Sequence, residues 1–179
     1  YRPQTVDFHY DRNGNMLNDE QGQRLRYDSQ GRLLDVSDPT GRTVTAYRYD
    51  GHNHLFGVTK SGESETLRFY QNERLSNTVQ DGKHIQYLYN QDQPLGQQQP
   101  GEPGQTLLLM TDGKHSVIGE SQQNDLRTAA YSTYGERSSD NSMQTLLAFN
   151  GEVRDEAAGW YLLGRGYRAY NPPLMRFHS

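Results

Sequence analysis

The sequence lacks cysteine altogether, which excludes disulfide bonds and thiolate metal sites. It is also poor in hydrophobic residues, which make up 32% of its 179 residues, and its mean hydropathy is −1.02. Soluble globular chains contain roughly 45–50% apolar residues, so we do not expect a deep, closed hydrophobic core. The longest apolar run, Leu107–Met110, is far shorter than the roughly 20 residues that cross a bilayer, so no membrane span is expected.

Charge of one sign does not accumulate anywhere in the chain. The 18 lysines and arginines are interspersed with 22 aspartates and glutamates, and the net charge is −4. Proteins that follow a phosphate backbone carry clustered basic residues, which this sequence does not have. Nucleic acid is therefore a poor candidate partner.

Tyrosine is abundant. The chain has 13 tyrosines, 5 phenylalanines and a single tryptophan, which is more aromatic surface than disordered chains carry. Tyrosine is amphipathic and favours strands. Together, few aliphatic residues and many tyrosines predict a thin, sheet-rich protein that is wet on much of both faces.

A repeated unit organises these tyrosines. In each copy a Tyr-Asp pair is followed within a few residues by Gly or Asn and then by an apolar pair. Clear copies begin at Tyr10-Asp11, Tyr27-Asp28 and Tyr49-Asp50, and weaker copies are anchored at Tyr70 and Tyr87. The anchors are about 20 residues apart, and repeats of that length indicate an array of supersecondary units.

Each unit predicts a β-hairpin. An alternation such as Tyr47-Arg48-Tyr49 places aromatic rings on one sheet face and polar side chains on the other. The aspartate is expected to bond nearby amides, and the glycine to adopt a positive φ in a tight turn. Neighbouring hairpins then pair edge to edge, so the predicted fold is all-β, with antiparallel hairpin repeats in a curved sheet.

Two segments depart from the repeat. Residues 91–105 are rich in Pro, Gly and Gln, and we predict that they form a surface loop because such a segment cannot pair as a strand. Ser142–Leu147 is the one stretch that can form a short helix. The final part of the chain is denser in aromatics and glycine and contains the tryptophan. We therefore expect a hairpin strip over 1–140 and a distinct unit over 141–179.

The repeats resemble the YD repeats that build the shells of RHS-repeat proteins. Residues 141–179 resemble the N-terminal part of the RHS-associated core. They are most similar to the core of the C component of bacterial insecticidal toxin complexes and of related polymorphic toxins. The matching motifs are Phe149-Asn150-Gly151, Asp155 to Gly159, Tyr161 to Tyr170, and Arg176-Phe177.

This resemblance implies both a fold and a role. It implies a piece of an RHS-type shell that encapsulates and delivers a C-terminal toxin domain, in a secreted or exported bacterial protein. The implied partners are the rest of the shell, the enclosed toxin domain, and a B-type toxin-complex component or a secretion-system spike. Open sheet edges also predict self-association.

The resemblance further implies that self-cleavage lies outside this sequence. In the family, the core cuts itself from the toxin with an aspartate-based autoprotease whose motif begins just after the stretch matched by Arg176-Phe177. That motif falls beyond Ser179, so we expect a segment of a longer protein that is not itself an enzyme. Asp38-Pro39-Thr40-Gly41 has the letters of the downstream motif, but it lies inside a repeat and is interpreted as a turn.

We predict no catalytic, cofactor-binding or metal-binding residues. Three residues near the expected core, Arg154, Asp155 and Arg176, have two interpretations. In the first they orient the missing catalytic groups. In the second, which we favour, Asp155 begins a turn closed by Gly159 and the arginines pair with local carboxylates.

Other patterns also have alternative interpretations. His52 and His54 lie on one strand face at a spacing that can hold zinc, but no third ligand lies nearby in the sequence, which favours a solvated turn. Gly164-Arg165-Gly166 is too short for a dinucleotide-binding fingerprint. Rows of tyrosine can stack on sugar rings. A carbohydrate- or surface-binding β module is therefore the alternative function, although the hairpin spacing of the tyrosines favours a structural role.

Overall fold

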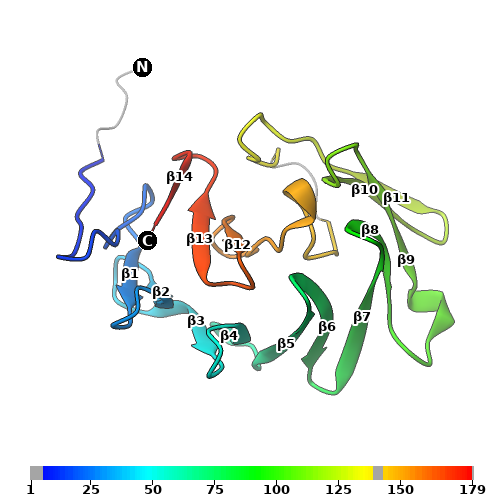
Figure 1. Ribbon diagram of the computed structural model, residues 1–179, viewed down its shortest axis with the longest axis horizontal. Coiled ribbons are helices and arrows are strands. Elements are labelled where there is room, and N and C mark those ends of the chain that lie inside the picture. The colour runs from blue at the N-terminus through cyan, green and yellow to red at the C-terminus, as the bar shows by residue number, and fades with distance from the viewer. Residues whose placement is uncertain (1–5, 139–142, 179) are drawn as a thin grey trace.

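The computed structural model describes residues 6–138 and 143–178. It contains an 11-stranded antiparallel sheet in which every strand pairs with its neighbours in sequence. In Figure 1 this sheet is a curved strip along the lower and right-hand sides of the molecule. Its strands are β1 (Arg24–Tyr27), β2 (Leu33–Ser37), β3 (Thr43–Tyr49), β4 (Leu55–Lys60), β5 (Thr66–Gln71), β6 (Arg74–Gln80), β7 (Lys83–Asn90), β8 (Gln93–Gln98), β9 (Leu107–Thr111), β10 (Val117–Gln122) and β11 (Asp125–Thr128).

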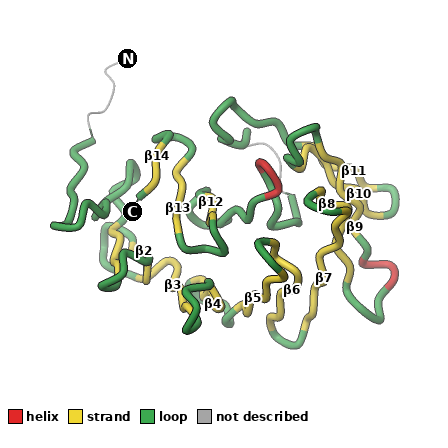
Figure 2. Tube along the Cα trace, in the orientation of Figure 1, coloured by secondary structure: helices red, strands yellow, loops and turns green. Residues whose placement is uncertain are grey.

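A second, three-stranded sheet lies inside the arc of the first, as the orange and red part of Figure 1 shows. Its strands are β12 (Tyr161–Leu163), β13 (Arg168–Asn171) and β14 (Arg176–Phe177). In the described part of the chain, the helical elements are two 3₁₀ turns, η1 (Pro103–Gln105) and η2 (Phe149–Gly151), drawn red in Figure 2. The predicted all-β fold, a curved sheet of antiparallel hairpins, is confirmed.

Six turns share one arrangement around an aspartate. In each, the Oδ1 atom accepts hydrogen bonds from the amides two and four residues later, over 2.8–3.0 Å. The residue three positions after the aspartate has a positive φ and is glycine in four of the turns. The aspartates are Asp11, Asp19, Asp28, Asp38, Asp50 and Asp112. The predicted turn chemistry is therefore present, and it extends to turns without a Tyr-Asp pair.

A second kind of turn joins later strands through two residues. It connects β5 to β6, β6 to β7, β7 to β8 and β10 to β11. The first turn residue has a φ between 50° and 54° in all of them, although none is glycine. These residues are Asn72, Asp81, Gln91 and Gln123. A positive φ at the first residue of a two-residue turn suits the right-handed twist of a hairpin.

The predicted surface loop over 91–105 is wrong for residues 93–98, which form β8 between β7 and β9. β9 bonds β8 at Gly96 and Gln97, so the missing amide of Pro94 removes no bond to β9. A side chain at Gly96 would approach the carbonyl oxygen of Leu107 to 2.7 Å. Proline is therefore tolerated at position 94, and the absence of a side chain is required at position 96.

The short helix predicted for Ser142–Leu147 is also absent. Residues 143–147 are irregular and contain a single β-bridge, between Leu147 and Val153. Ser142 lies outside the described residues.

The hydrophobic residues form two clusters on the concave side of the sheet. The first joins β1–β4 to the C-terminal segment, and it contains Leu25, Leu33, Val36, Tyr47, Leu55, Val58, Trp160, Leu162 and Ala169. The second joins β6–β10 to residues 129–153, and it contains Leu75, Tyr87, Leu107, Leu109, Val117, Ala129, Met143, Leu147 and Val153. The expectation of a sheet wet on both faces therefore holds for the outer face only, because residues 143–178 cover the inner one.

Candidate functional site

Residues 143–178 pack against the curved sheet along much of its length, and we take this contact as the candidate functional site. Backbone hydrogen bonds attach the segment at widely separated points. The amide of Leu55 in β4 donates to the carbonyl oxygen of Arg165 over 2.8 Å, and the amide of Val117 in β10 donates to that of Ala148 over 2.9 Å. The amide of Met16 donates to the carbonyl oxygen of His178 over 2.7 Å. The C-terminal segment is thus bonded to both halves of the sheet.

The repeat tyrosines face this contact. The Tyr47 hydroxyl donates to Asp155 Oδ2 over 2.9 Å, and the Tyr49 hydroxyl donates to the carbonyl oxygen of Gly166 over 3.3 Å. Burial, followed by the charge of Asp155, raises the pKa of the Tyr47 phenol well above its usual value, so it remains a donor. The tyrosines therefore act as amphipathic filler, with their rings in the core and their hydroxyls bonded.

This placement argues against rows of tyrosine that stack on sugars. The tyrosines of β1, β3, β5 and β7 are buried or half-buried against the two clusters. The tyrosines that are exposed, Tyr10, Tyr134 and Tyr167, lie outside the strands.

Asp155 forms the turn that the sequence predicts. Its Oδ1 accepts from the amides of Ala157 and Ala158, each over 3.0 Å, and its carbonyl oxygen accepts from the amide of Gly159 over 2.8 Å. The side chain is 1% exposed, and its second oxygen is occupied by Tyr47. Both carboxylate oxygens therefore have structural partners.

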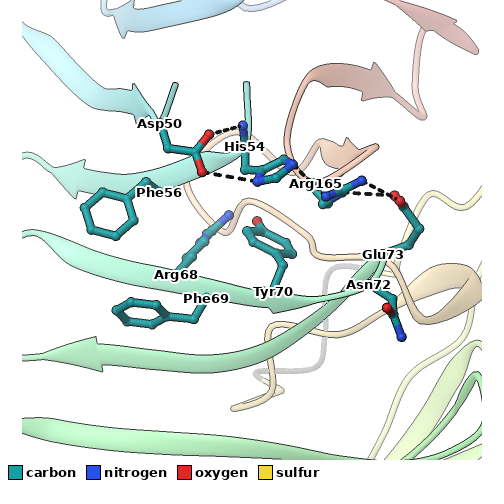
Figure 3. A pocket seen from close by; sticks show the side chains of 9 residues that line it. All are labelled: Asp50, His54, Phe56, Arg68, Phe69, Tyr70, Asn72, Glu73 and Arg165. Carbon is teal, nitrogen blue, oxygen red and sulfur yellow. Dashed lines mark hydrogen bonds and ion pairs between the residues drawn. The ribbon is translucent and has the colours of Figure 1, made fainter. Parts of the chain in front are cut away.

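A line of polar contacts joins the Asp50 turn to the C-terminal segment (Figure 3). Asp50 Oδ2 lies 3.1 Å from His54 Nδ1, and Arg165 Nη1 lies 2.6 Å from His54 Nε2. Arg165 Nη2 donates to Glu73 Oε1 over 2.7 Å. Because arginine only donates, His54 Nε2 accepts and Nδ1 carries the proton toward Asp50.

These residues border a depression of about 680 Å3, which also contains Arg68 from β5. Arg68 is 4% exposed, and its Nε and Nη1 atoms have no hydrogen-bond partner among the described residues. Sequence alternation did not mark it, because in β5 the arginine faces inward and Phe69, 41% exposed, faces outward. The Arg68 guanidinium acts on the neighbouring Tyr70 phenol, but no carboxylate pairs with it among the described residues, and a buried charge without an opposite partner is costly.

The sequence model of the Teneurin YD-shell family matches residues 1–179. The chain belongs to the YD-shell family. No curated protein matches it in sequence.

Solved structures of similar fold come from toxin complexes. The Tc holotoxin pore of Photorhabdus luminescens is 16% identical, with a TM-score of 0.67, over 95% of this chain and 9% of the other. A crystal structure of TcdB2-TccC3-Cdc42 is 17% identical, with a TM-score of 0.66, over 95% of this chain and 9% of that one. At these identities the likeness shows a shared fold, and the chain spans about a tenth of the length of these relatives.

The arginines of this YD-shell segment do not pair as the favoured interpretation expected. Arg154 has no carboxylate partner among the described residues, and burial, followed by the charge of Arg137, lowers its pKa. Arg176 donates to the Tyr10 hydroxyl over 3.1 Å. The expected local ion pairs are therefore wrong for Arg154 and Arg176. Arg176 is exposed, whereas Arg154 lies near the phenols of Tyr131 and Tyr161.

The histidine pair also has a different setting from the one predicted. The rings of His52 and His54 are stacked with their centroids 5.9 Å apart. Both ring nitrogens of His54 have polar partners, Asp50 and Arg165, so this turn is not simply solvated. Among the described residues, no group of three or more His, Cys, Asp or Glu side chains is arranged so that it could hold a metal ion. Gly164-Arg165-Gly166 is a turn with positive φ at all three residues, and Arg165 binds Glu73 from it.

Two buried polar residues of the YD-shell segment were not found by sequence reasoning. Glu120 in β10 is fully buried and accepts from Arg127 Nη1 over 3.0 Å and from the amides of Gln144 and Thr145 over 2.7 and 3.0 Å. His178 packs edge-on to Trp160 at 4.1 Å, and burial lowers its pKa to about 4. Glu120 anchors one end of the C-terminal segment and His178 the other. Only the single tryptophan was a signal for this contact.

The described residues also contain no helix that is long and apolar enough to cross a membrane.

Proposed function

We propose that this YD-shell segment is part of the wall of a hollow shell that encapsulates and delivers a C-terminal toxin domain. Residues 141–179 would then be the N-terminal part of the core that closes the shell. The observation that supports this is the strip of eleven hairpin strands curved around its own C-terminal segment. In this proposal the segment works through geometry and contributes no catalytic group.

The open end of the sheet supports a continuing wall. β11 is the last strand in the sheet order and pairs with β10 alone among the described strands. An unpaired strand edge is a template for another strand. We propose that a further part of the shell pairs there in the parent protein, and that two copies of the isolated chain pair there in its absence.

The similar solved structures suggest a partner class. Several are assemblies of TcdB2 with TccC3. By analogy, we propose that the parent protein assembles with a B-type toxin-complex component, or with a secretion-system spike, and that it is a bacterial protein exported from the cell.

Protease protection tests the encapsulation proposal. In the full natural protein that contains this segment, the polypeptide enclosed by the shell should resist a protease that digests it once the protein is unfolded. Trp160→Ala, which removes the centre of the inner contact, should expose it, whereas Leu126→Ser on the outer face should not. Equal digestion rates for the enclosed and the free polypeptide would contradict encapsulation. Recovery of the protein from the culture medium tests export separately.

A further inference from the structure

The wall function proposed above has no use for Arg68, the buried arginine of β5. This residue borders the depression of about 680 Å3 beside the Asp50 turn, and it also borders a smaller cavity of about 200 Å3 that Lys83 lines. Its Nε and Nη1 atoms are enclosed without a hydrogen-bond partner among the described residues, whereas Nη2 is not enclosed in this way. An anion can therefore reach the guanidinium through one of its nitrogens.

Two donors of β5 point into the depression. Arg68 and Tyr70 lie on the same face of the strand because side chains alternate, and Phe69 between them faces outward. In Figure 3 the guanidinium and the Tyr70 hydroxyl both project from β5 toward the line of polar contacts that begins at Asp50. Among the described residues, the Tyr70 hydroxyl, like Nε and Nη1 of Arg68, has no hydrogen-bond partner of normal geometry. Two adjacent donors thus lack an acceptor.

The other charged groups around the depression already have partners. Asp50 Oδ1 accepts from two amides of its turn, and Oδ2 lies against His54. Both oxygens of Glu73 accept from Arg165, over 2.7 and 3.3 Å. Of the charged residues that line the depression, Arg68 is therefore the one without an opposite charge bound to it among the described residues. One negative charge would balance it.

The surroundings of the guanidinium are dry and aromatic. Burial raises the pKa of the phenols of Tyr47, Tyr49 and Tyr87, and the charge of Arg68 opposes that rise in each. Asp155, which also acts on Tyr47, has both of its oxygens occupied by Tyr47 and by amides of its own turn. Exclusion of water strengthens a hydrogen bond between charged groups, so an anion that reaches Arg68 gains more than it would on an exposed arginine.

We propose that Arg68, assisted by Tyr70, binds a carboxylate group that enters through this depression. Arginine suits a carboxylate because its N–H groups can meet both oxygens, and the adjacent hydroxyl is a further donor. The carboxylate meets Nη2 first, and a rotation of the guanidinium on its flexible stem brings a second N–H to it.

The charges around the depression favour a carboxylate over a phosphate. A carboxylate has the single negative charge that balances Arg68, whereas a phosphate dianion brings a second charge toward Asp50 and Glu73. Carboxylates occur in small organic acids and in acidic side chains of polypeptides. Nothing in this site is needed for the wall function, so the two proposals stand or fall separately.

Titration of the intact chain with acetate at constant ionic strength tests the site. The NMR resonances of the β5 amides and of the Arg68 Nε–H group should shift saturably, with a dissociation constant on the order of 10 mM or tighter. Acetamide, which has the shape of acetate without its charge, should cause no saturable shift, and inorganic phosphate should bind at least about threefold more weakly than acetate. No saturable shift with acetate, an equal response to acetamide, or tighter binding of phosphate would overturn the proposal.

Matched variants locate the binding. Arg68→Met keeps the length of the side chain without its charge and should abolish the saturable shift of the β5 amides, and Tyr70→Phe should weaken binding about threefold. Arg48→Met at an exposed arginine of β3 and Lys83→Met at the smaller cavity should leave the affinity unchanged. Unchanged affinity in Arg68→Met, or an equal loss in Lys83→Met, would contradict the proposal. If Arg68→Met does not fold, the Nε–H resonance of the unmodified chain still decides whether acetate meets this guanidinium.

The source of the carboxylate is a separate arm of the experiment. A Gly-Glu-Gly peptide with blocked ends is titrated in parallel with acetate and with its Gly-Gln-Gly counterpart. Tighter binding of the acidic peptide than of acetate would assign the site to a polypeptide, and tighter binding of acetate would assign it to a small molecule. Equal binding of the two peptides, with no response to acetate, would overturn it.

Discussion

The two halves of the large sheet connect their successive strands with different kinds of turn. Between β1 and β4 the turns are built around aspartate, whose carboxylate bonds two amides in each turn. From β5 to β8 the strands are joined through two residues, the first of which is left-handed. Strands β1–β4 obtain their turns from side-chain hydrogen bonds and strands β5–β8 from backbone conformation, whereas Asp112 again forms the turn between β9 and β10. The first half is therefore visible in the sequence as clear copies of the repeat, whereas the second gives only the weaker copies at Tyr70 and Tyr87.

The halves also differ in what covers them. Trp160 and His178 lie over β1–β4, whereas Leu147 and the Glu120 contacts lie over β7–β10. Each cluster takes its C-terminal members from a different part of residues 143–178. If the halves are separate cooperative units, damage to one cover should leave the other half protected.

The largest expected effect comes from removing these covers. Trp160→Ala should lower the free energy of unfolding by about 3–5 kcal/mol, and Leu147→Ala by about 2–5 kcal/mol, because both residues are 1% exposed and would leave cavities. Amide hydrogen exchange should accelerate mainly in β2–β4 for Trp160→Ala and mainly in β7–β10 for Leu147→Ala. Uniform acceleration in both variants would show that the halves form one unit.

Acid should act on the first half through His178. Its pKa is lowered to about 4 by burial, whereas an unfolded histidine titrates near 6.5. As the pH falls below 6.5, the unfolded state binds a proton that the folded state does not, so stability is lost. The loss should be about 2 kcal/mol between pH 7 and pH 5 and should level off below pH 4.

Urea unfolding at both pH values measures this loss. His178→Phe should remove about 2 kcal/mol of the pH dependence while keeping the ring contact with Trp160. The same slope in wild type and variant would mean that other groups are responsible.

The aspartate turns should be sensitive to the loss of a single acceptor. Asp28→Ala removes hydrogen bonds to the amides of Gln30 and Arg32 and an ion pair with Arg32, so it should cost about 1–2 kcal/mol. Asp28→Asn keeps an oxygen for the two amides and should cost less. Thermal unfolding distinguishes the two, and equal losses would indicate that the charge, rather than the acceptor, is what matters.

The smallest expected effects are changes in stability of opposite sign in the two kinds of turn. Gln91, with a φ of 54°, pays for a left-handed conformation that glycine adopts freely, so Gln91→Gly should stabilise the chain by up to about 1 kcal/mol. Gly31, with a φ of 77°, is the reverse case, and Gly31→Ala should destabilise it by about 1 kcal/mol. Denaturation midpoints that move in the same direction for both would contradict this account.

Much of the fold could be predicted from the sequence because its signals are local. The Tyr-Asp pairs and the glycines after them mark turns whose hydrogen bonds join residues only two to four positions apart. β8 was missed because the value of Pro94 and Gly96 depends on which edge of the strand meets β9, and the sequence does not reveal that. Local rules describe a hairpin, but they do not say which breaker residues a neighbouring strand can accept.

The contact site was less predictable because it is formed by residues far apart in the chain. The Asp155 turn was found from its own five residues, but its bond to Tyr47 spans 108 positions. Arg68 and Glu120 are buried polar residues in strands, and Glu120 accepts from amides of the C-terminal segment 24 and 25 positions away. Low hydrophobicity correctly indicated a small core. It could not show that the chain covers the inner face of its sheet with its own final residues.

Hydrogen-bond scalar couplings measured by NMR test the central claim directly, because they report the two atoms that share the proton. We predict couplings from the Leu55 amide nitrogen to the Arg165 carbonyl carbon and from the Val117 amide nitrogen to that of Ala148. Both would place the C-terminal segment inside the curved sheet. Their absence, together with rapid exchange of these two amides, would show that the segment lies elsewhere and would contradict the account.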